Sequence, residues 1–332
     1  MTFPRLQLRQ ETMLLLVLVL LVAIVGIINP SFLTYFNLFS MLKSSTVVGL
    51  FAIGFFIVLI IGGLDVSFAA IAVVAMYGTV TLANALFPDL SIWLLFGIAA
   101  LMGAGLGAIN GLLVTWLKAP SLIITLGTTS LFRGFLLYFV GTDTIRKVPS
   151  GMVEFSRTNI LTLTADNGAK VGLHVSVLMF LLIAALVFFV MRYTTVGRSL
   201  YAIGGNRVAA ARMGINVQRI EILAYTTAGL LAGIAGLTAA GVIRLANPQT
   251  LVGGELDVIA AVVIGGAAIT GGRGSVIGVL LGTLLIVTTN NSLIVLGVST
   301  VWQKVAIGAL LLLAIGLPLF GQFSQRQRGT EP

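Results

Sequence analysis

The sequence contains no cysteine and a single histidine, His174. The absence of cysteine excludes disulfides, thiol catalysis, iron–sulfur clusters and cysteine-ligated zinc, and one imidazole leaves little scope for histidine chemistry. Charge is also scarce, because only 9% of the 332 residues are Asp, Glu, Lys or Arg, whereas an ordinary soluble domain carries about 25%. Together with an apolar fraction of 58%, this scarcity excludes a water-soluble enzyme and predicts a polytopic membrane protein.

Phosphate-binding and hydrolytic motifs are missing as well. No Gly-Lys dipeptide occurs, so there is no Walker A loop, and neither HExxH nor GxSxG is found. Since the few carboxylates are scattered, we expect no catalytic site, no metal site and no cofactor. Any ATP that drives this protein must then be bound by another chain. We assign the formal net charge of +9 to orientation in a membrane and contact with its lipid, and expect no nucleic-acid partner.

Apolar segments long enough to cross a bilayer recur along the chain, and a helix needs about 20 apolar residues to do so. Two of them enclose a lone cation, Arg133 or Lys304, and the short window 258–272 is either a short crossing or a re-entrant helix. The expected spans are 12–42, 44–64, 66–88, 90–117, 120–140, 171–191, 222–242, 258–272, 274–303 and 300–320. Residues 1–332 therefore predict one all-α transmembrane domain of about ten helices, with eight spans and a re-entrant pair as the alternative.

Cations gather in segments that we place on the cytoplasmic side, following the positive-inside rule. The segment 192–221 holds five arginines against one acid, Glu221. Further cations of that side are Arg5 and Arg9 at the head and Arg326 and Arg328 at the tail. An even number of spans then places both termini in the cytoplasm. The polar segment 141–172 lies outside; it is too short for an independent domain, and we expect a lid or a docking rim.

Glycines recur at the spacing that lets helix backbones approach closely in lipid. They are Gly103, Gly107 and Gly111, then Gly274, Gly278 and Gly282, and the pair Gly229 and Gly233. This pattern predicts a tight bundle and carries no information about a substrate. The glycine-rich run 271–275 follows no strand, so we interpret it as a tight turn between helices.

The segment 192–221 contains a short helix with both caps. Asn206 is a good N-cap for a helix over 207–213, three alanines favour that helix, and Gly214 suits the position after its end. A helix of two turns between membrane spans buries almost nothing by itself. Two uses remain open: insertion into a groove on another protein, or an interfacial position on anionic lipid.

Four blocks of sequence resemble one transporter family, in the family's order. They are Gly-Gly-Leu-Asp-Val-Ser at 62–67, Ala-Pro-Ser-Leu-Ile-Ile-Thr-Leu-Gly at 119–127 followed by Arg133 and Gly134, the loop 197–215, and Glu-Leu-Asp-Val-Ile-Ala-Ala-Val-Val-Ile-Gly-Gly at 255–266 followed by Gly-Gly-Arg-Gly at 271–274. The chain resembles, over about 29–316, the permease subunit of bacterial ATP-binding-cassette monosaccharide importers, in the branch that serves ribose, xylose, galactose and autoinducer-2.

The resemblance implies a set of partners and a location. It implies two cytoplasmic ATP-binding-cassette subunits, a second permease copy or homologue, a periplasmic sugar-binding protein and the bacterial inner membrane. The loop 197–215 resembles the one that docks on the ATPase, which favours the first use of the capped helix. The residues expected to couple the two subunits are Gly197, Arg198, Gly204, Asn206, Ala209, Ala210 and Gly214. We expect Ala209 and Ala210 on the contact face.

A monosaccharide or small polyol would be recognised by polar groups that match its hydroxyls. The candidates for the translocation path are Asp65, Asn110, Thr125, Thr128, Arg133, Asn290 and Asn291. Each is at least as well explained by a hydrogen bond between helices. Phe68 stands close to where the family usually has glycine, which adds bulk if this stretch lines the path. The alternative function is an ATP-independent channel or facilitator for small polar solutes.

Overall fold

Helices dominate the structure, because lipid offers no hydrogen-bond partner to an unpaired backbone. The computed structural model describes residues 10–164, 168, 170–249, 251, 253–299 and 301–312. Within that part, eight helices are long and apolar enough to cross a bilayer. They are α1 (Gln10–Ile28), α2 (Tyr35–Ile60), α3 (Phe68–Leu86), α4 (Ile92–Leu117), α5 (Ser121–Phe135) continued by the π-helical η2 (Leu136–Val140), α7 (Val175–Tyr193), α10 (Val217–Ile243) and α12 (Val276–Val295).

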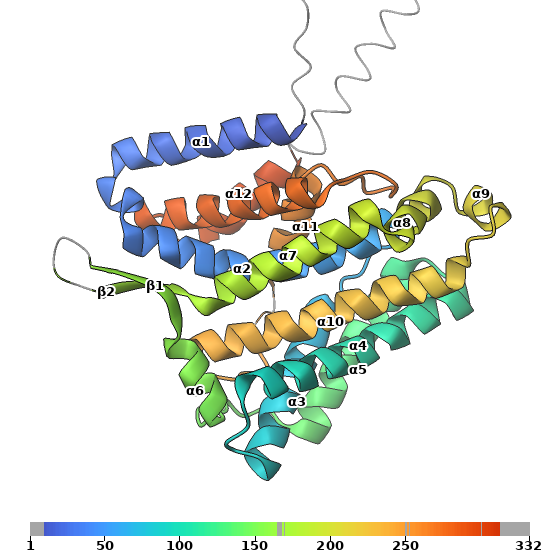
Figure 1. Ribbon diagram of the computed structural model, residues 1–332, viewed down its shortest axis with the longest axis horizontal. Coiled ribbons are helices and arrows are strands. Elements are labelled where there is room, and N and C mark those ends of the chain that lie inside the picture. Colours follow the sequence, from blue (N-terminus) through green and yellow to red (C-terminus); the bar gives the residue numbers. More distant parts are fainter. Residues whose placement is uncertain are drawn as a thin grey trace, which may run out of the picture.

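Several of the shorter elements lie at the two ends of the bundle (Figure 1). At one end lie α8 (Thr195–Gly205) and α9 (Arg207–Arg212), and at the opposite end lie α6 (Ser150–Arg157) and the hairpin of β1 (Asn159–Thr164) and β2 (Lys170–His174). The others are η1 (Pro30–Leu33), α11 (Glu255–Ile264) and the apolar helix Val301–Leu312. At 10 residues, α11 is about 15 Å long, half of a bilayer core.

The count of ten spans remains a prediction. The eight long helices correspond to eight of the expected segments, and α11 and Val301–Leu312 fall in the other two. The end of the last expected span and both chain termini lie outside the described residues.

The boundary between the first two spans differs from the expectation. Pro30 at the start of η1 ends the first helix, and the Thr34 hydroxyl accepts a hydrogen bond from the Asn37 amide (3.4 Å) at the start of α2. Lys43 therefore lies inside α2 and not in an outer connection. An uncharged window does not show where a helix breaks within it, whereas proline and cap residues do.

The glycine patterns mark close helix contacts, as expected. A Cβ on Gly107 would overlap the backbone carbonyl of Tyr225 and lie 3.0 Å from the Gly229 Cα. Gly103 faces Gly229 in the same way, so α4 and α10 pack backbone to backbone. Figure 1 shows these two helices side by side along the length of the bundle. The turn at 271–275 is also confirmed, with positive φ at three of its glycines.

The segment 141–172, at the end of the bundle opposite α8 and α9, is more ordered than a loop. It contains α6 and most of an antiparallel hairpin in which Leu161 pairs with Leu173 and Leu163 with Val171. The all-α prediction is confirmed for the spans, and this two-stranded hairpin lies between two of them. The strand sequence alternates apolar and polar residues over 161–164. This period of two indicates a strand, and a search for long apolar runs does not detect it.

Candidate functional site

The short helix α9 has the two caps that the sequence predicts. The Asn206 side chain accepts a hydrogen bond from the Ala209 amide (2.9 Å), and Gly214 has a φ of +83°. The helix ends at Arg212, one residue earlier than expected. A side chain at position 214 would be strained in this left-handed conformation, which glycine adopts freely.

The predicted contact face of α9 is wrong at one residue, Ala210. Ala210 is fully buried against the body of the chain, whereas Ala209 is exposed. Successive residues of a helix point about 100° apart, so two neighbours do not share a narrow face. The apolar side chains that α9 presents outward are Val208, 61% exposed, and Met213 just after it, 69% exposed.

The helix α8 connects α9 to the bundle and packs against it. The Thr194 hydroxyl caps α8 by accepting from the Gly197 amide (3.3 Å). A Cβ on Gly197 would overlap the carbonyl of Met191, and one on Gly204 would overlap the carbonyl of Ile60. These two expected coupling residues are therefore close-contact positions that fix α8 against α7 and the end of α2. Arg198 is exposed on the same helix.

An ion pair joins α9 to α10. The Arg207 Nη2 donates to the Glu221 Oε2 (2.9 Å), and the second guanidinium nitrogen contacts the other carboxylate oxygen. The Glu221 side chain is 3% exposed and the Arg207 side chain 57%. Our sequence reasoning missed this pair, although Glu221 is the single acid among the cations of its segment.

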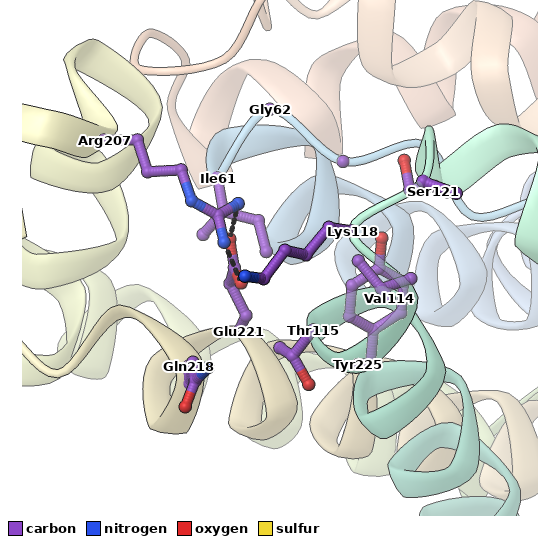
Figure 2. A pocket seen from close by; sticks show the side chains of 12 residues that line it. Ile61, Gly62, Val114, Thr115, Lys118, Ser121, Arg207, Gln218, Glu221 and Tyr225 are labelled. Carbon is purple, nitrogen blue, oxygen red and sulfur yellow. Dashed lines mark hydrogen bonds and ion pairs between the residues drawn. The ribbon is translucent and has the colours of Figure 1, made fainter.

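This ion pair lines a polar cavity of about 400 Å³ (Figure 2). Its wall combines α9 and α10 with the α2–α3 connection, the end of α4 and the start of α5; the lining includes Gly62, Lys118, Ser121, Arg207, Glu221 and Tyr225. The Ser121 hydroxyl accepts from the Leu64 amide (2.8 Å), which ties α5 to the α2–α3 connection. The start of α9 therefore adjoins the ends of several spans at one junction.

Three candidates for the translocation path lie together around this connection. The Asp65 Oδ1 accepts from the Ser67 hydroxyl (2.6 Å), which accepts in turn from the Asn110 Nδ2 (2.6 Å). The Thr125 hydroxyl donates to the Leu64 carbonyl (3.2 Å). Asp65, Asn110 and Thr125 are almost completely buried, so in this conformation the network links α3, α4 and α5.

Of the other candidates, Thr128 adjoins that network through Thr125, whereas Asn290 and Asn291 lie apart from it on α12. Thr128 donates to the Thr125 carbonyl of its own helix (3.2 Å). Asn290 and Asn291 lie on α12, with side-chain oxygens that are buried and have no hydrogen-bond partner within the described residues. Phe68 packs against aromatic rings of α2, with its centroid 5.2 Å from that of Phe51.

Two ion pairs lie at the start of α11, and Arg133 forms one of them. Its Nη2 lies 3.2 Å from the Glu255 Oε1, and the Lys304 Nζ lies 3.1 Å from the Asp257 Oδ1. Both acids occupy the first turn of α11, where the helix dipole favours a negative charge. The two cations come from α5 and from helix Val301–Leu312, so α11 holds both helices electrostatically.

Comparison with known proteins assigns the chain to a class. Residues 37–315 match the family described as the branched-chain amino acid transport system, permease component. The ribose import permease protein RbsC of Haemophilus influenzae is 34% identical over 298 residues, 90% of each chain. The D-allose permease AlsC of Escherichia coli is 33% identical over 303 residues, 91% of this chain and 89% of that one. No solved structure matches the chain.

The chain therefore belongs to this permease family. It is the multi-pass, membrane-embedded subunit of an ATP-binding-cassette importer, a transport subunit of a class that works with a separate ATPase and a substrate-binding protein. The autoinducer 2 permease LsrC of Yersinia enterocolitica is a further relative, 34% identical over 307 residues, 92% of this chain and 81% of that one. The resemblance stated from the sequence blocks is confirmed.

Proposed function

We propose that this permease imports a monosaccharide or a similar small polyol across the bacterial inner membrane. It would act with two cytoplasmic ATPase subunits, a second permease copy or homologue and a periplasmic binding protein. Both termini would lie in the cytoplasm, on the side of α8 and α9. The observation that carries the proposal is the similarity to permeases named for ribose, allose and autoinducer 2 along about nine-tenths of the chain.

The charges of the bundle favour a neutral substrate. The family description mentions branched-chain amino acids, whose ammonium and carboxylate groups would need fixed partners of both signs. In the part that the structure describes, Arg133 in α5 and Glu255 in α11 are bound to each other. A polyol needs only hydroxyl, amide and backbone groups, which suits the uncharged candidates Asn110, Thr125, Thr128, Asn290 and Asn291.

Coupling would begin at the outward face of α9. Closure of the ATPases would move Val208 and Met213 with their partner surface, and the Arg207–Glu221 ion pair would pass the motion to α10. Gly197, Gly204, Asn206 and Gly214 would keep the segment rigid. Because α10 packs on α4 through glycines, the two helices would swing together between outward-facing and inward-facing states.

The side of α5 that faces away from the rest of the chain is our candidate for the translocation path, which would then lie between two permease copies. Gly127, Ser130 and Gly134 are exposed along one side of this helix, and a Cβ on either glycine would meet nothing within 4 Å. Small and polar residues that face away from a chain within a span favour contact with another protein or with water over contact with lipid. Arg133 lies beside this stripe.

Purification of the permease with its ATPase tests the proposal. We expect Val208→Asp with Met213→Asp to lose the ATPase and ATP-dependent sugar uptake, because two carboxylates would enter an apolar contact. The matched control is Ile160→Asp with Leu161→Asp, two exposed apolar positions of β1 at the opposite end, which should retain the ATPase.

The alternative function gives a different result. A permease that purifies without any ATPase and conducts sugar into liposomes in the absence of ATP would be a facilitator, and the proposal would be rejected. Unfolding temperatures of both double variants close to the wild-type value establish that loss of the ATPase is not loss of folding.

A further inference from the structure

A second hollow lies at the same end of the molecule, on the side formed by α7, α12 and the first turn of α1. It consists of two adjoining cavities of about 800 and 400 Å³ that share Phe188, Arg192, Gly274 and Ser275. We call this surface the basic groove. It is separate from the polar cavity of Figure 2, with which it has no lining residue in common.

The groove is lined by positive charge. Arg192 and Arg273 line the larger cavity, and Arg192 and Arg198 the smaller one. All three arginines are exposed, and none forms an ion pair with another residue that the structure describes. One carboxylate, Glu11, also lines the groove, and its Oε1 accepts a hydrogen bond from the Ser275 hydroxyl (2.6 Å).

The first turn of α12 opens into the same groove. Ser275 caps this 20-residue helix and accepts from the Gly278 amide (2.9 Å), while Ile277 lines the wall. The free amides and the dipole of a helix start favour an anion. This contribution adds to that of the arginines, which carry the larger charge.

The groove also has an apolar side. Phe188 and Ile277 line it, and Ile277 is 45% exposed. Tyr193, the last residue of the span α7, is 58% exposed, and the Arg192 guanidinium lies 5.9 Å from its ring centroid. Cations beside an aromatic residue at the end of a span are typical of the membrane interface. The site therefore joins a polar head region to lipid-facing surface.

We propose that the basic groove binds an anionic phospholipid, with its phosphate between Arg192 and Arg273 and an acyl chain along Phe188 and Ile277. Basic pockets between spans are suited to anionic headgroups. A free phosphate would use the arginines alone and leave the apolar wall in contact with water. With the orientation given under the proposed function, this lipid would belong to the cytoplasmic leaflet. That assignment alone rests on the proposed function.

Lipid selectivity of the purified permease, without ATPase or sugar, tests this site. Spin-labelled phosphatidylglycerol and phosphatidylcholine are compared by the fraction of each that the protein immobilises. We expect the preference for phosphatidylglycerol to fall in Arg192→Gln with Arg273→Gln, by roughly 5-fold for each arginine removed. The control, Arg219→Gln with Arg244→Gln, removes two exposed cations outside the groove and should keep the wild-type preference.

Four outcomes would overturn the proposal. An unchanged preference in the groove variant would show that Arg192 and Arg273 do not select the lipid. An equal loss of preference in the control would assign the selectivity to the overall charge of the protein. Displacement of the labelled lipid by inorganic phosphate at comparable concentration assigns a free-anion site. Displacement by added ATPase subunit, with ATPase binding lost in the groove variant, assigns the arginines to protein docking. Since the permease is measured alone, failure here is distinct from failure of the proposed function.

Discussion

At the scale of single residues, the two members of the Arg207–Glu221 pair have unequal surroundings. Glu221 is buried, whereas more than half of the Arg207 side chain meets solvent. Removing the arginine leaves an uncompensated buried carboxylate, while removing the charge of Glu221 leaves an arginine that water can solvate. The energetic effect of each substitution should therefore differ, although both break the same contact.

This asymmetry gives the first prediction. Arg207→Ala should lower the unfolding free energy by about 3 kcal/mol, and Glu221→Gln by less than about 1 kcal/mol. Thermal unfolding in detergent measures both. The double variant should recover most of the stability lost in Arg207→Ala, because the buried charge is gone. Equal losses in the two single variants would contradict the interpretation.

His174 links the β1–β2 hairpin to α7. Its Nδ1 accepts from the Ser176 amide (3.2 Å), so the proton sits on Nε2, which donates to the Phe155 carbonyl (3.0 Å). Burial lowers the pKa of His174 from its usual 6.5; the Phe155 carbonyl opposes the shift and the Lys43 charge adds to it.

The second prediction follows from the sign of that shift. As pH falls below about 6.5, the unfolded chain binds a proton that the folded chain refuses, so stability decreases until the lowered pKa is passed. Its slope is at most about 1.4 kcal/mol per pH unit. His174→Asn keeps an N-cap acceptor and should remove the slope of unfolding free energy against pH, measured by unfolding at a series of pH values. A slope that persists in this variant would come from other titratable groups.

At the scale of elements, the contact between α4 and α10 depends on glycine at particular positions. Gly107 lies in that contact, whereas Gly105 on the same helix is exposed, and a Cβ added there would meet nothing within 4 Å. The two glycines therefore form a matched pair, because an added methyl group has a neighbour to displace only at position 107.

The third prediction uses this pair. Gly107→Ala should destabilise the protein by about 1–3 kcal/mol through overpacking, and Gly105→Ala should leave stability unchanged or raise it by up to about 1 kcal/mol. Unfolding temperatures of the two variants provide the comparison. Similar effects at both positions would mean that the helices do not approach at their backbones.

The fourth prediction concerns the caps of α9. Asn206→Ala removes the acceptor for the Ala209 amide and should cost about 1 kcal/mol of local stability. Gly214→Ala should cost about as much, because alanine is strained at positive φ. Amide exchange of residues 207–212 should quicken in both variants, while exchange in α10 stays slow. Unchanged exchange in the short helix would show that neighbouring contacts, and not the caps, hold it.

At the scale of the whole molecule, patterns local to the chain are predictable and contacts between distant segments are not. Uncharged runs predict the long helices, and Asn206 and Gly214 predict the caps of α9. The pairing of Arg207 with Glu221, or of Arg133 with Glu255, depends on how α9, α10, α5 and α11 come together. No local pattern carries that information.

The differences between expectation and structure have the same origin. Polar groups in apolar spans need partners, and the sequence leaves two uses open for Asn110 and Thr125: contact with a substrate or a hydrogen bond between helices. The structure shows the Asn110 Nδ2 and the Thr125 hydroxyl bonded within the chain. Ala210 does not lie on the contact face that the sequence predicts, since a helix taken alone does not show which side meets the bundle. Whether the polar residues of α5 and α12 meet a substrate remains a prediction.

The ion pairs at the start of α11 have an electrical consequence. An elementary charge that crosses the membrane potential changes its energy by about 2.3 kcal/mol per 100 mV. Arg133 is paired with Glu255, and Lys304 with Asp257, so a pair that moves as a unit would carry no net charge through the field. If a neutral sugar is the cargo, turnover should be insensitive to voltage in liposomes with an imposed potassium gradient, and Glu255→Gln should introduce sensitivity. Nucleotide, and not voltage, would then set the direction of the cycle.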